Sequence, residues 1–283
     1  MDDIQVKDVM TPEVIFVHAP GKKADAIKLL AQNRISGIPV VKKGTRKLVG
    51  IITRQNIFDH PHEDQTALIM TKNPISVRPD MPICEAIAIM EQKSLRRLPV
   101  VEKDGLVGIL TATDILRLIA NQNIDTPIET LIKGPCQPVW AGTPLRVVAS
   151  IFELSGAYAL PVLDSRSKVV GIVTDYDLFS LTTTNTRTVV STMGLADDEE
   201  AWNYEGLKNL MRLYYEISST KLPNIAVEKV MVRNPVSVSM KTGASEAAKR
   251  MREHNFRQLP VKDSNDRLKA MLSDMDLLSV LLR

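Results

Sequence analysis

The sequence Gly108-Ile109-Leu110-Thr111-Ala112-Thr113-Asp114 combines a short apolar strand, a hydroxyl at its end and, three residues later, a carboxylate at the start of a helix. The same pattern returns at three other places in the chain, and it keeps the carboxylate at two of them. These copies are Gly171-Ile172-Val173-Thr174-Asp175-Tyr176-Asp177, Ala270-Met271-Leu272-Ser273-Asp274-Met275-Asp276 and Gly50-Ile51-Ile52-Thr53-Arg54-Gln55-Asn56. Four copies in one chain indicate an internal repeat.

Each copy places the same elements before this pattern. A short strand precedes an amphipathic helix, and a second strand with an apolar-Pro-Val sequence leads through a polar turn into the third strand. The repeat is therefore strand, helix, strand, strand, helix, with the last two strands forming a hairpin. The prolines are Pro39, Pro99, Pro161 and Pro260; first strands are expected at 14–17, 75–77, 138–140 and 236–238, and closing helices at 55–58, 114–120, 177–181 and 276–282.

The start of the first helix of a copy is clearest in the second copy. Asp80 can cap a backbone N–H ahead of Pro82, and Ile83, Ile87 and Met90 recur at helical spacing. These residues predict a helix with a single buried stripe.

One copy of roughly 55 residues would leave a face of its sheet uncovered, so the copies should pack in pairs, the first with the second and the third with the fourth. The expected fold class is α+β, similar to an α/β sandwich, with repeat domains at 1–61, 62–122, 123–182 and 227–283. Two pairs in one chain can close into a disc, which leaves both a monomer and a homodimer open.

Residues 183–226 interrupt the repeat as a helical insertion. Within them, 197–217 begins with acidic residues and continues with apolar residues at helical spacing, which predicts a helix. This helix can pack over the edge of its own domain or dock a protein partner, and the sequence leaves both interpretations open.

The composition argues against several classes of protein. The net charge of +3 comes from 36 basic and 33 acidic residues, a balance that gives no general attraction to nucleic acid or to a membrane. No apolar run reaches the ~20 residues of a membrane helix, and the start Met1-Asp2-Asp3 is not a secretory signal, so a cytoplasmic protein is expected. Cys84 and Cys136 lack metal-ligand spacing and are expected to be buried thiols.

The end of the third strand has a chemistry of its own. A strand that ends at a helix N-terminus exposes backbone donors that favour an anion such as phosphate. An ionised Asp only accepts hydrogen bonds, so it matches a vicinal diol such as that of ribose. The alternative is that each Asp only caps its helix, although a cap alone requires neither a hydroxyl at fixed spacing nor a basic residue elsewhere in the repeat.

The fourfold pattern resembles the cystathionine-β-synthase (CBS) domain, whose pairs are called Bateman modules. The resemblance covers nearly the whole chain except the insertion, and it depends on the apolar-Pro-Val sequence of all four copies and the Thr/Ser-x-x-Asp ending of three. Four copies without an attached catalytic domain are similar to the gamma subunit of AMP-activated protein kinase and to stand-alone prokaryotic CBS proteins. The resemblance implies a regulatory protein that binds adenine nucleotides and is not an enzyme.

The resemblance also implies how each binding site is assembled. The ending motif and a basic residue come from one copy, and an early hydroxyl comes from its mate. Arg96, Arg97 and Arg257 are then the phosphate candidates, because an Arg side chain can donate two hydrogen bonds to one phosphate. Alternatively, they are solvated cations at helix ends.

The four predicted sites differ in completeness. The second site, with Thr111, Asp114, Arg96 and Thr11, is complete. The fourth has Ser273, Asp276 and Arg257 but Lys133 in place of the hydroxyl; the third has Thr174 and Asp177 but Tyr158 and Val232; the first has Thr53 and Thr71, with Asn56 replacing the acid and Ser36 the cation. The first site is therefore expected to be empty or weak.

The leading interpretation is a regulatory sensor that binds AMP, ADP or ATP and passes its occupancy to a partner. Two alternatives remain: a sensor of S-adenosylmethionine or a related nucleoside, and an interaction scaffold with vestigial sites. The sequence contains no P-loop, nucleophile elbow or His-x-x-x-His pair, which argues against an enzyme. It also contains no RNA-binding or helix-turn-helix motif, which argues against a nucleic-acid partner.

Overall fold

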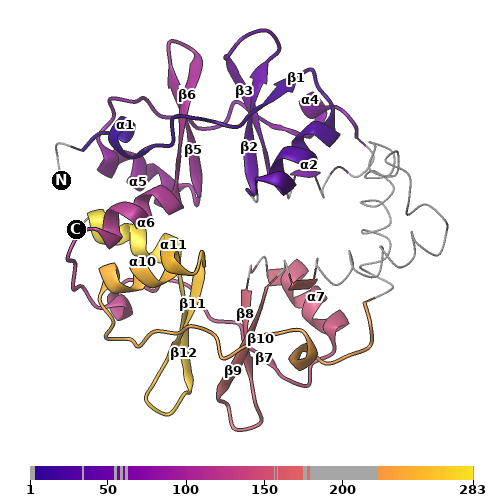
Figure 1. Ribbon diagram of the computed structural model, residues 1–283, viewed down its shortest axis with the longest axis vertical. Helices are drawn as coiled ribbons and strands as arrows, with labels where there is room; N and C mark the ends of the chain where they lie inside the picture. Colours follow the sequence, from indigo (N-terminus) through magenta and orange to yellow (C-terminus); the bar gives the residue numbers. More distant parts are fainter. Residues whose placement is uncertain are drawn as a thin grey trace. The chain divides into compact units, whose positions relative to one another are not determined.

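The computed structural model divides into two compact units (Figure 1). Unit 1 is Met1–Asn123 with Leu278–Arg283, and unit 2 is Ile124–Leu277. The structure describes residues 4–33, 35–53, 56–57, 60, 63–155, 157, 159–174, 177–178 and 222–282. The expected helix at 197–217 and Tyr158 lie outside the described residues, as do most residues of the insertion.

Unit 1 contains the first two copies of the repeat. Its helices are α1 (Val6–Val9), α2 (Lys23–Gln32), α4 (Thr66–Ile69), α5 (Ile83–Gln92), α6 (Ala112–Ala120) and, from the C-terminal residues, the 3₁₀ helix η4 (Ser279–Leu282). Its strands are β1 (Val17–Ala19), β2 (Gly37–Lys42), β3 (Leu48–Thr53), β4 (Thr71–Lys72), β5 (Arg97–Glu102) and β6 (Gly105–Thr111).

Unit 2 contains the third and fourth copies. Its helices are the 3₁₀ helix η1 (Ile128–Thr130), α7 (Leu145–Ser155), the 3₁₀ helix η3 (Val227–Lys229), α10 (Ala244–Glu253) and α11 (Asp274–Leu278). Its strands are β7 (Val139–Trp140), β8 (Ala159–Leu163), β9 (Val169–Thr174), β10 (Val232–Arg233), β11 (Gln258–Lys262) and β12 (Leu268–Ser273).

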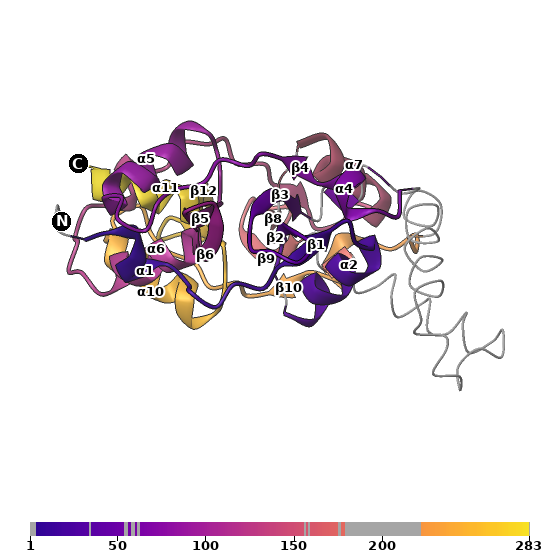
Figure 2. The ribbon, with the colours of Figure 1, turned by 90° about the horizontal axis from the view of Figure 1, so that it is seen from above.

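The predicted hairpin is present in every copy, as the antiparallel pairs β2–β3, β5–β6, β8–β9 and β11–β12. In the first copy β2 also pairs in parallel with β1, and this pairing begins at Val40. Pro39, which has no backbone N–H, stands opposite Ile51 of β3 and one residue before the parallel pairing with β1 begins. The hairpins of one unit lie side by side (Figures 1 and 2), and an isolated bridge between Lys47 and Gly105 joins them next to their turns in unit 1.

The two copies of unit 1 exchange their opening segments. Helix α1, from the first copy, packs against α5, α6 and β6 of the second, and Val6 donates its backbone N–H to Met81 O at 2.9 Å. Helix α4, from the second copy, packs against α2, β1 and β3 of the first, and Thr66 N donates to Gly21 O at 2.9 Å. Val6 and Thr66 are fully buried. Each copy therefore completes the core of its mate.

Unit 2 repeats this exchange with other residues. Ile128 N, at the start of η1, donates to Thr242 O at 3.0 Å, immediately before α10 of the fourth copy. Leu145 N, at the start of α7 in the third copy, donates to Ile225 O at 3.0 Å, immediately before η3. Strand β10 of the fourth copy extends the sheet of the third by pairing with β9. The predicted pairing of first with second and third with fourth copies is confirmed.

A glycine in the third strand allows the opening segment of the mate to approach closely. A Cβ atom added at any of these glycines would overlap the sulfur of a methionine from the other copy. The pairs are Gly50 with Met70, Gly108 with Met10 and Gly171 with Met231. The fourth copy has Ala270 at the glycine position, and its mate has Ile132 at the methionine position. The two differences occur together. Where the strand has the larger alanine, the mate has isoleucine, which is branched and lacks the long tip of methionine.

Three local predictions need correction. Asp80 does not cap α5: the N-cap residue is Pro82, and Asp80 instead accepts hydrogen bonds from Arg78, at 2.9 Å from Nε. This ion pair also holds the pKa of the Asp80 carboxyl below its usual value. The first strand of a copy is shorter and later than expected; β1 begins at Val17, the last residue of the expected range. The two thiols, Cys84 and Cys136, are partly rather than fully buried.

The C-terminal residues belong to unit 1 and pack against α5. Val280 and Leu281 are 6% and 4% exposed, and the Cys84 thiol donates to Leu281 O at 3.6 Å. Among the residues that the structure describes, no helix has both the length and the hydropathy that crossing a bilayer requires.

Substituting Gly108 with Ala should destabilise unit 1, because the new methyl group overlaps the Met10 side chain across the pair. Overpacking of this kind costs about 1–3 kcal/mol. Adding Met10→Ile, which reproduces the Ala-Ile combination of the fourth copy, should recover most of the loss. Calorimetric thermal unfolding measures both effects. Gly134→Ala is the matched control, since nothing lies within 4 Å of its added Cβ, and equal losses for Gly108→Ala and Gly134→Ala would contradict the explanation.

Candidate functional site

The Thr-x-x-Asp motif of the second copy forms a capping box at the start of α6. Thr111 is the N-cap residue, and its Oγ1 accepts from Asp114 N at 3.4 Å. In return, Asp114 Oδ2 accepts from Thr111 N at 2.9 Å and from Thr111 Oγ1 at 2.6 Å. This reciprocal arrangement satisfies backbone donors that the first helical turn cannot pair.

The same capping arrangement recurs in the other three copies. In each, the backbone N–H and hydroxyl of the strand-end residue donate to the side chain three positions later, at 2.7–2.9 Å; the pairs are Thr53–Asn56, Thr174–Asp177 and Ser273–Asp276. The expectation that capping does not require the hydroxyl was therefore wrong. The fixed spacing of the motif is explained by helix capping alone, so binding has to be argued from other atoms.

The second carboxylate oxygen of Asp114 is turned toward the first copy. Thr11 Oγ1 donates to Asp114 Oδ1 at 3.2 Å, so the early hydroxyl of one copy meets the acid of the other, as expected for the second site. A carboxylate oxygen can accept about two hydrogen bonds, so Oδ2 is saturated while Oδ1 retains capacity for one more. The side chain is 4% exposed, and Arg117 Nη2 lies 3.8 Å from Oδ1.

Asn56 occupies the same position in the first site, but its side chain has no acceptor atom left for a further hydrogen bond. Its Oδ1 accepts from Thr53 N at 2.9 Å and Thr53 Oγ1 at 2.8 Å, which saturates the only acceptor atom of the side chain. Its Nδ2 donates to Thr71 Oγ1 at 3.2 Å. The first site therefore brings its predicted residues together but has no side-chain acceptor for a sugar hydroxyl at this position.

In unit 2, the third and fourth sites differ from the complete second site at the positions that the sequence indicated, Val232 and Lys133. Lys133, which replaces the hydroxyl, donates its backbone N–H to Asp276 Oδ1 at 3.3 Å. Asp276 is 8% exposed, and its Oδ2 is saturated by Ser273. In the third site, Val232 lies in β10, which pairs with β9 at Ile172.

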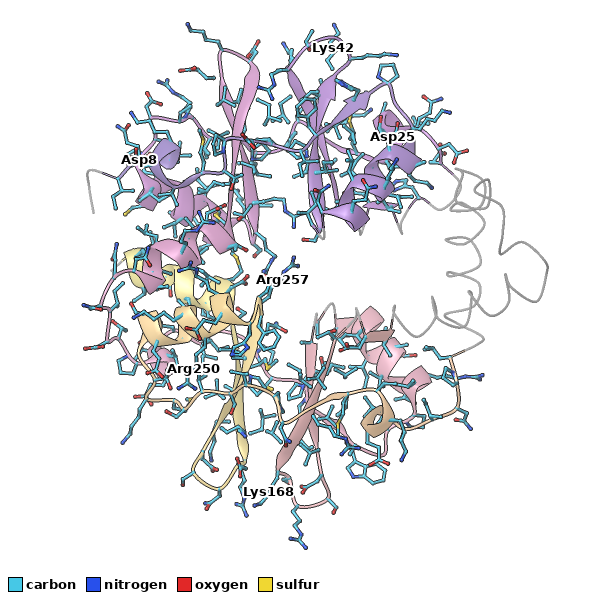
Figure 3. The ribbon with its side chains drawn as sticks, viewed as in Figure 1. Asp8, Asp25, Lys42, Lys168, Arg250 and Arg257 are labelled. Carbon is cyan, nitrogen blue, oxygen red and sulfur yellow. The ribbon has the colours of Figure 1, made fainter. Side chains whose placement is uncertain are left out.

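The backbones of Arg96 and Arg257 lie next to the capping boxes. Arg96 O accepts from Ala112 N at 3.0 Å, and Arg257 O accepts from Asp274 N at 2.9 Å, so each Arg is held next to the helix that its acid caps. Figure 3 shows Arg257 near the N-terminal end of β11. Arg96 is partly buried and Arg257 is exposed.

Arg97 reaches the other copy, which the sequence analysis did not anticipate. Its Nη2 donates to Ser36 Oγ at 2.6 Å, and a Cβ atom added at Gly37 would overlap its guanidinium. Gly37 and Arg97 occupy the same position of the repeat, two residues before the proline. The absence of a side chain at Gly37 was the signal in the sequence for this contact.

Two further observations concern a hollow outside the predicted sites and the binding of metal ions. A hollow of about 240 Å³ in unit 1 is lined by residues outside these sites, namely Lys47, Leu48, Asn73, Pro74, Ser76, Val101 and Asp104. In the described part of the chain, His, Cys, Asp and Glu side chains do not gather in groups of three or more that could hold a metal ion.

Comparison with known proteins identifies the repeat. A family model described as the CBS domain matches residues 6–63, 66–121, 128–182 and 227–283. The chain belongs to the CBS domain family. The predicted resemblance is thereby confirmed, together with an α+β fold made of paired CBS repeats.

The chain is similar to two archaeal proteins over nearly its whole length. It is 23% identical to MJ1225 of Methanocaldococcus jannaschii, covering 96% of this chain and 97% of that protein. The crystal structure of MJ1225, a proposed archaeal homologue of γ-AMPK, is 22% identical with a TM-score of 0.74, over 98% and 100% of the two chains. A conserved protein from Pyrococcus horikoshii is 26% identical, with a TM-score of 0.70 and the same coverage.

A shorter match is CBSX2, crystallised in complex with AMP. It is 28% identical and covers 40% of this chain and 94% of its own, with a TM-score of 0.38.

Substituting Thr111 with Ala should destabilise unit 1, because the capping box loses both the acceptor for Asp114 N and a donor to Asp114 Oδ2. Loss of an N-cap hydroxyl typically costs about 1 kcal/mol. Thr111→Ser should keep most of the stability, as the natural serine of the fourth copy does. Thermal unfolding measures the effect, with Thr113→Ala as the control on the exposed side of the same helical turn. A Thr111→Ala protein as stable as the wild type would contradict the assigned capping role.

Proposed function

We propose that the chain is a regulatory protein that binds an adenine nucleotide (AMP, ADP or ATP) at the second site of unit 1. Proteins of the CBS domain family are generally regulatory, and this chain consists largely of four CBS domains. The proposal concerns the ligand class and the site that recognises it.

The observation that carries the proposal is the remaining acceptor capacity of Asp114 Oδ1. A buried carboxylate oxygen with room for one more hydrogen bond, next to a rotatable hydroxyl, suits a sugar hydroxyl. Because Oδ2 is committed to the capping box, the proposed contact of Asp114 with the ribose diol uses one carboxylate oxygen, Oδ1.

The phosphate end of the ligand would contact Arg96. This residue is held beside the start of α6 by the hydrogen bond from Ala112 N to Arg96 O. An Arg side chain binds phosphate through paired donors, so its charge and geometry favour a nucleotide over an uncharged nucleoside.

The site also offers a route to regulation. Thr11 belongs to the first copy and Asp114 to the second, so a ligand held between them stabilises the association of the two copies. A ligand that binds one arrangement of the copies better shifts the population toward that arrangement, and a partner protein can detect this shift.

Substituting Asp114 with Asn should weaken binding of AMP, ADP and ATP by about 10- to 100-fold, because a hydrogen bond to a charged acceptor contributes roughly 1.5–3 kcal/mol. The fold should persist, since Asn56 forms the same capping box in the first copy. Isothermal titration calorimetry on the full chain measures the affinities, and S-adenosylmethionine is titrated in parallel.

The control variant is Asp25→Asn, which removes an exposed acid from the first turn of α2. A second control compares AMP with its 2′,3′-dideoxy analogue, which lacks the diol. The wild type should prefer AMP, and Asp114→Asn should lose that preference. Equal binding of both ligands by the wild type would exclude recognition of the diol by Asp114.

A further inference from the structure

Helix α7 of the third copy has apolar residues on two sides. One side faces the core of unit 2 and consists of Leu145, Val148 and Phe152. The other side, the outer stripe, consists of Val147 and Leu154, with the partly buried Ile151 between them. Val147 is 48% exposed and Leu154 is 87% exposed. A helix that is apolar on both sides is typical of a helix packed between two neighbours.

The outer stripe distinguishes the third copy from the other three. When the copies are aligned on the proline of the second strand, their first helices match without a gap. The position of Val147 is acidic in the other copies, where it is Asp25, Glu85 and Glu246. The position of Leu154 is polar there, as Gln32, Gln92 and Glu253. Two positions that are polar on three of these helices are therefore apolar in the copy that the insertion follows.

The corresponding helix of the second copy shows that the outside of such a helix can be a packing surface. Helix α5 contacts η4, which comes from the C-terminal residues and not from the first two copies. The Cys84 thiol of α5 donates to Leu281 O at 3.6 Å, and Leu281 is 4% exposed. A distant segment of the chain thus covers part of α5.

The chain on either side of residues 179–221, which lie outside the described residues, is anchored in the same core as α7. Leu178 precedes this segment and Leu222 follows it, and both belong to the buried cluster that includes Leu145. Leu222 O also accepts from Arg146 Nε, in the first turn of α7, at 3.4 Å. Both ends of the segment therefore lie at the core that α7 covers.

We propose that residues 197–217 of the same chain dock on the outer stripe of α7. The sequence predicts a helix there, with an apolar side that consists of Leu207, Leu210, Met211, Tyr214 and Ile217. Docking this side on the outer stripe removes both apolar surfaces from water. The occupant belongs to the same chain because anchoring at both ends gives it a higher local concentration than a free partner has. The inference is independent of the nucleotide site in unit 1.

Amide hydrogen exchange of the full chain, followed by mass spectrometry, tests the docking. In the wild type, peptides from 197–217 should be protected. The double variant Val147→Glu/Leu154→Glu should raise their exchange rate by about tenfold or more, because two apolar contacts are lost. The fold tolerates both changes, since Glu246 and Glu253 occupy these positions in α10. Peptides from β8 and β9 should keep their protection.

The matched control is Gln92→Glu, which introduces the same residue at the Leu154 position of α5 and should leave 197–217 unchanged. Leu210→Glu, on the other surface, should act like the double variant, and combining the two should add little. An unprotected 197–217 in the wild type, or equal protection in the wild type and the double variant, would overturn the proposal. So would a wild-type dimer, measured by light scattering, that the double variant dissociates, because a second copy would then occupy the outer stripe.

Discussion

The structure of each unit depends on the exchange of opening segments between two copies. The opening helices α1 and α4 are only one turn long, and a helix of that length has no stability of its own. Each is held because its backbone donors and its buried face find partners on the other copy, as Val6 does with Met81 and Thr66 does with Gly21. A single copy would leave these groups unpaired and its sheet uncovered, so the pair is the smallest stable assembly of this fold.

The candidate site is a product of the same exchange. Thr11 directly follows the exchanged segment of the first copy, and this places its hydroxyl against Asp114 of the second. The close approach requires a glycine at position 108, because any side chain there would overlap Met10. Packing between copies and assembly of the candidate site therefore have one cause, and the proposed ligand would act directly on the contact that defines the unit.

The sequence motif combines helix capping and candidate ligand binding, and in the structure different side-chain oxygens of Asp114 serve these two roles. One side-chain oxygen stabilises the helix start in every copy, whereas a second acceptor oxygen is present only in the three copies that retain the acid. Asn56 demonstrates the distinction, since it keeps the capping hydrogen bonds and lacks the second acceptor oxygen. The two sites of unit 1 have diverged accordingly: the second keeps the acid, and the first receives the guanidinium of Arg97.

The sequence by itself determined the fourfold repeat, the order of its elements, the hairpins and the pairing of copies, because periodic apolar residues, prolines and turns are local signals. It also identified Thr11 and Asp114 as members of one site, through the resemblance to the CBS domain. It misplaced the short first strands, whose bounds depend on pairing with β2 and β8, and it assigned Asp80 to a cap although Arg78 lies close enough to compete. Only the tertiary structure decided which oxygen of Asp114 is committed to capping and that the Arg97 side chain contacts the copy to which it does not belong. Both depend on distances between atoms of different copies, and a linear sequence does not contain those distances.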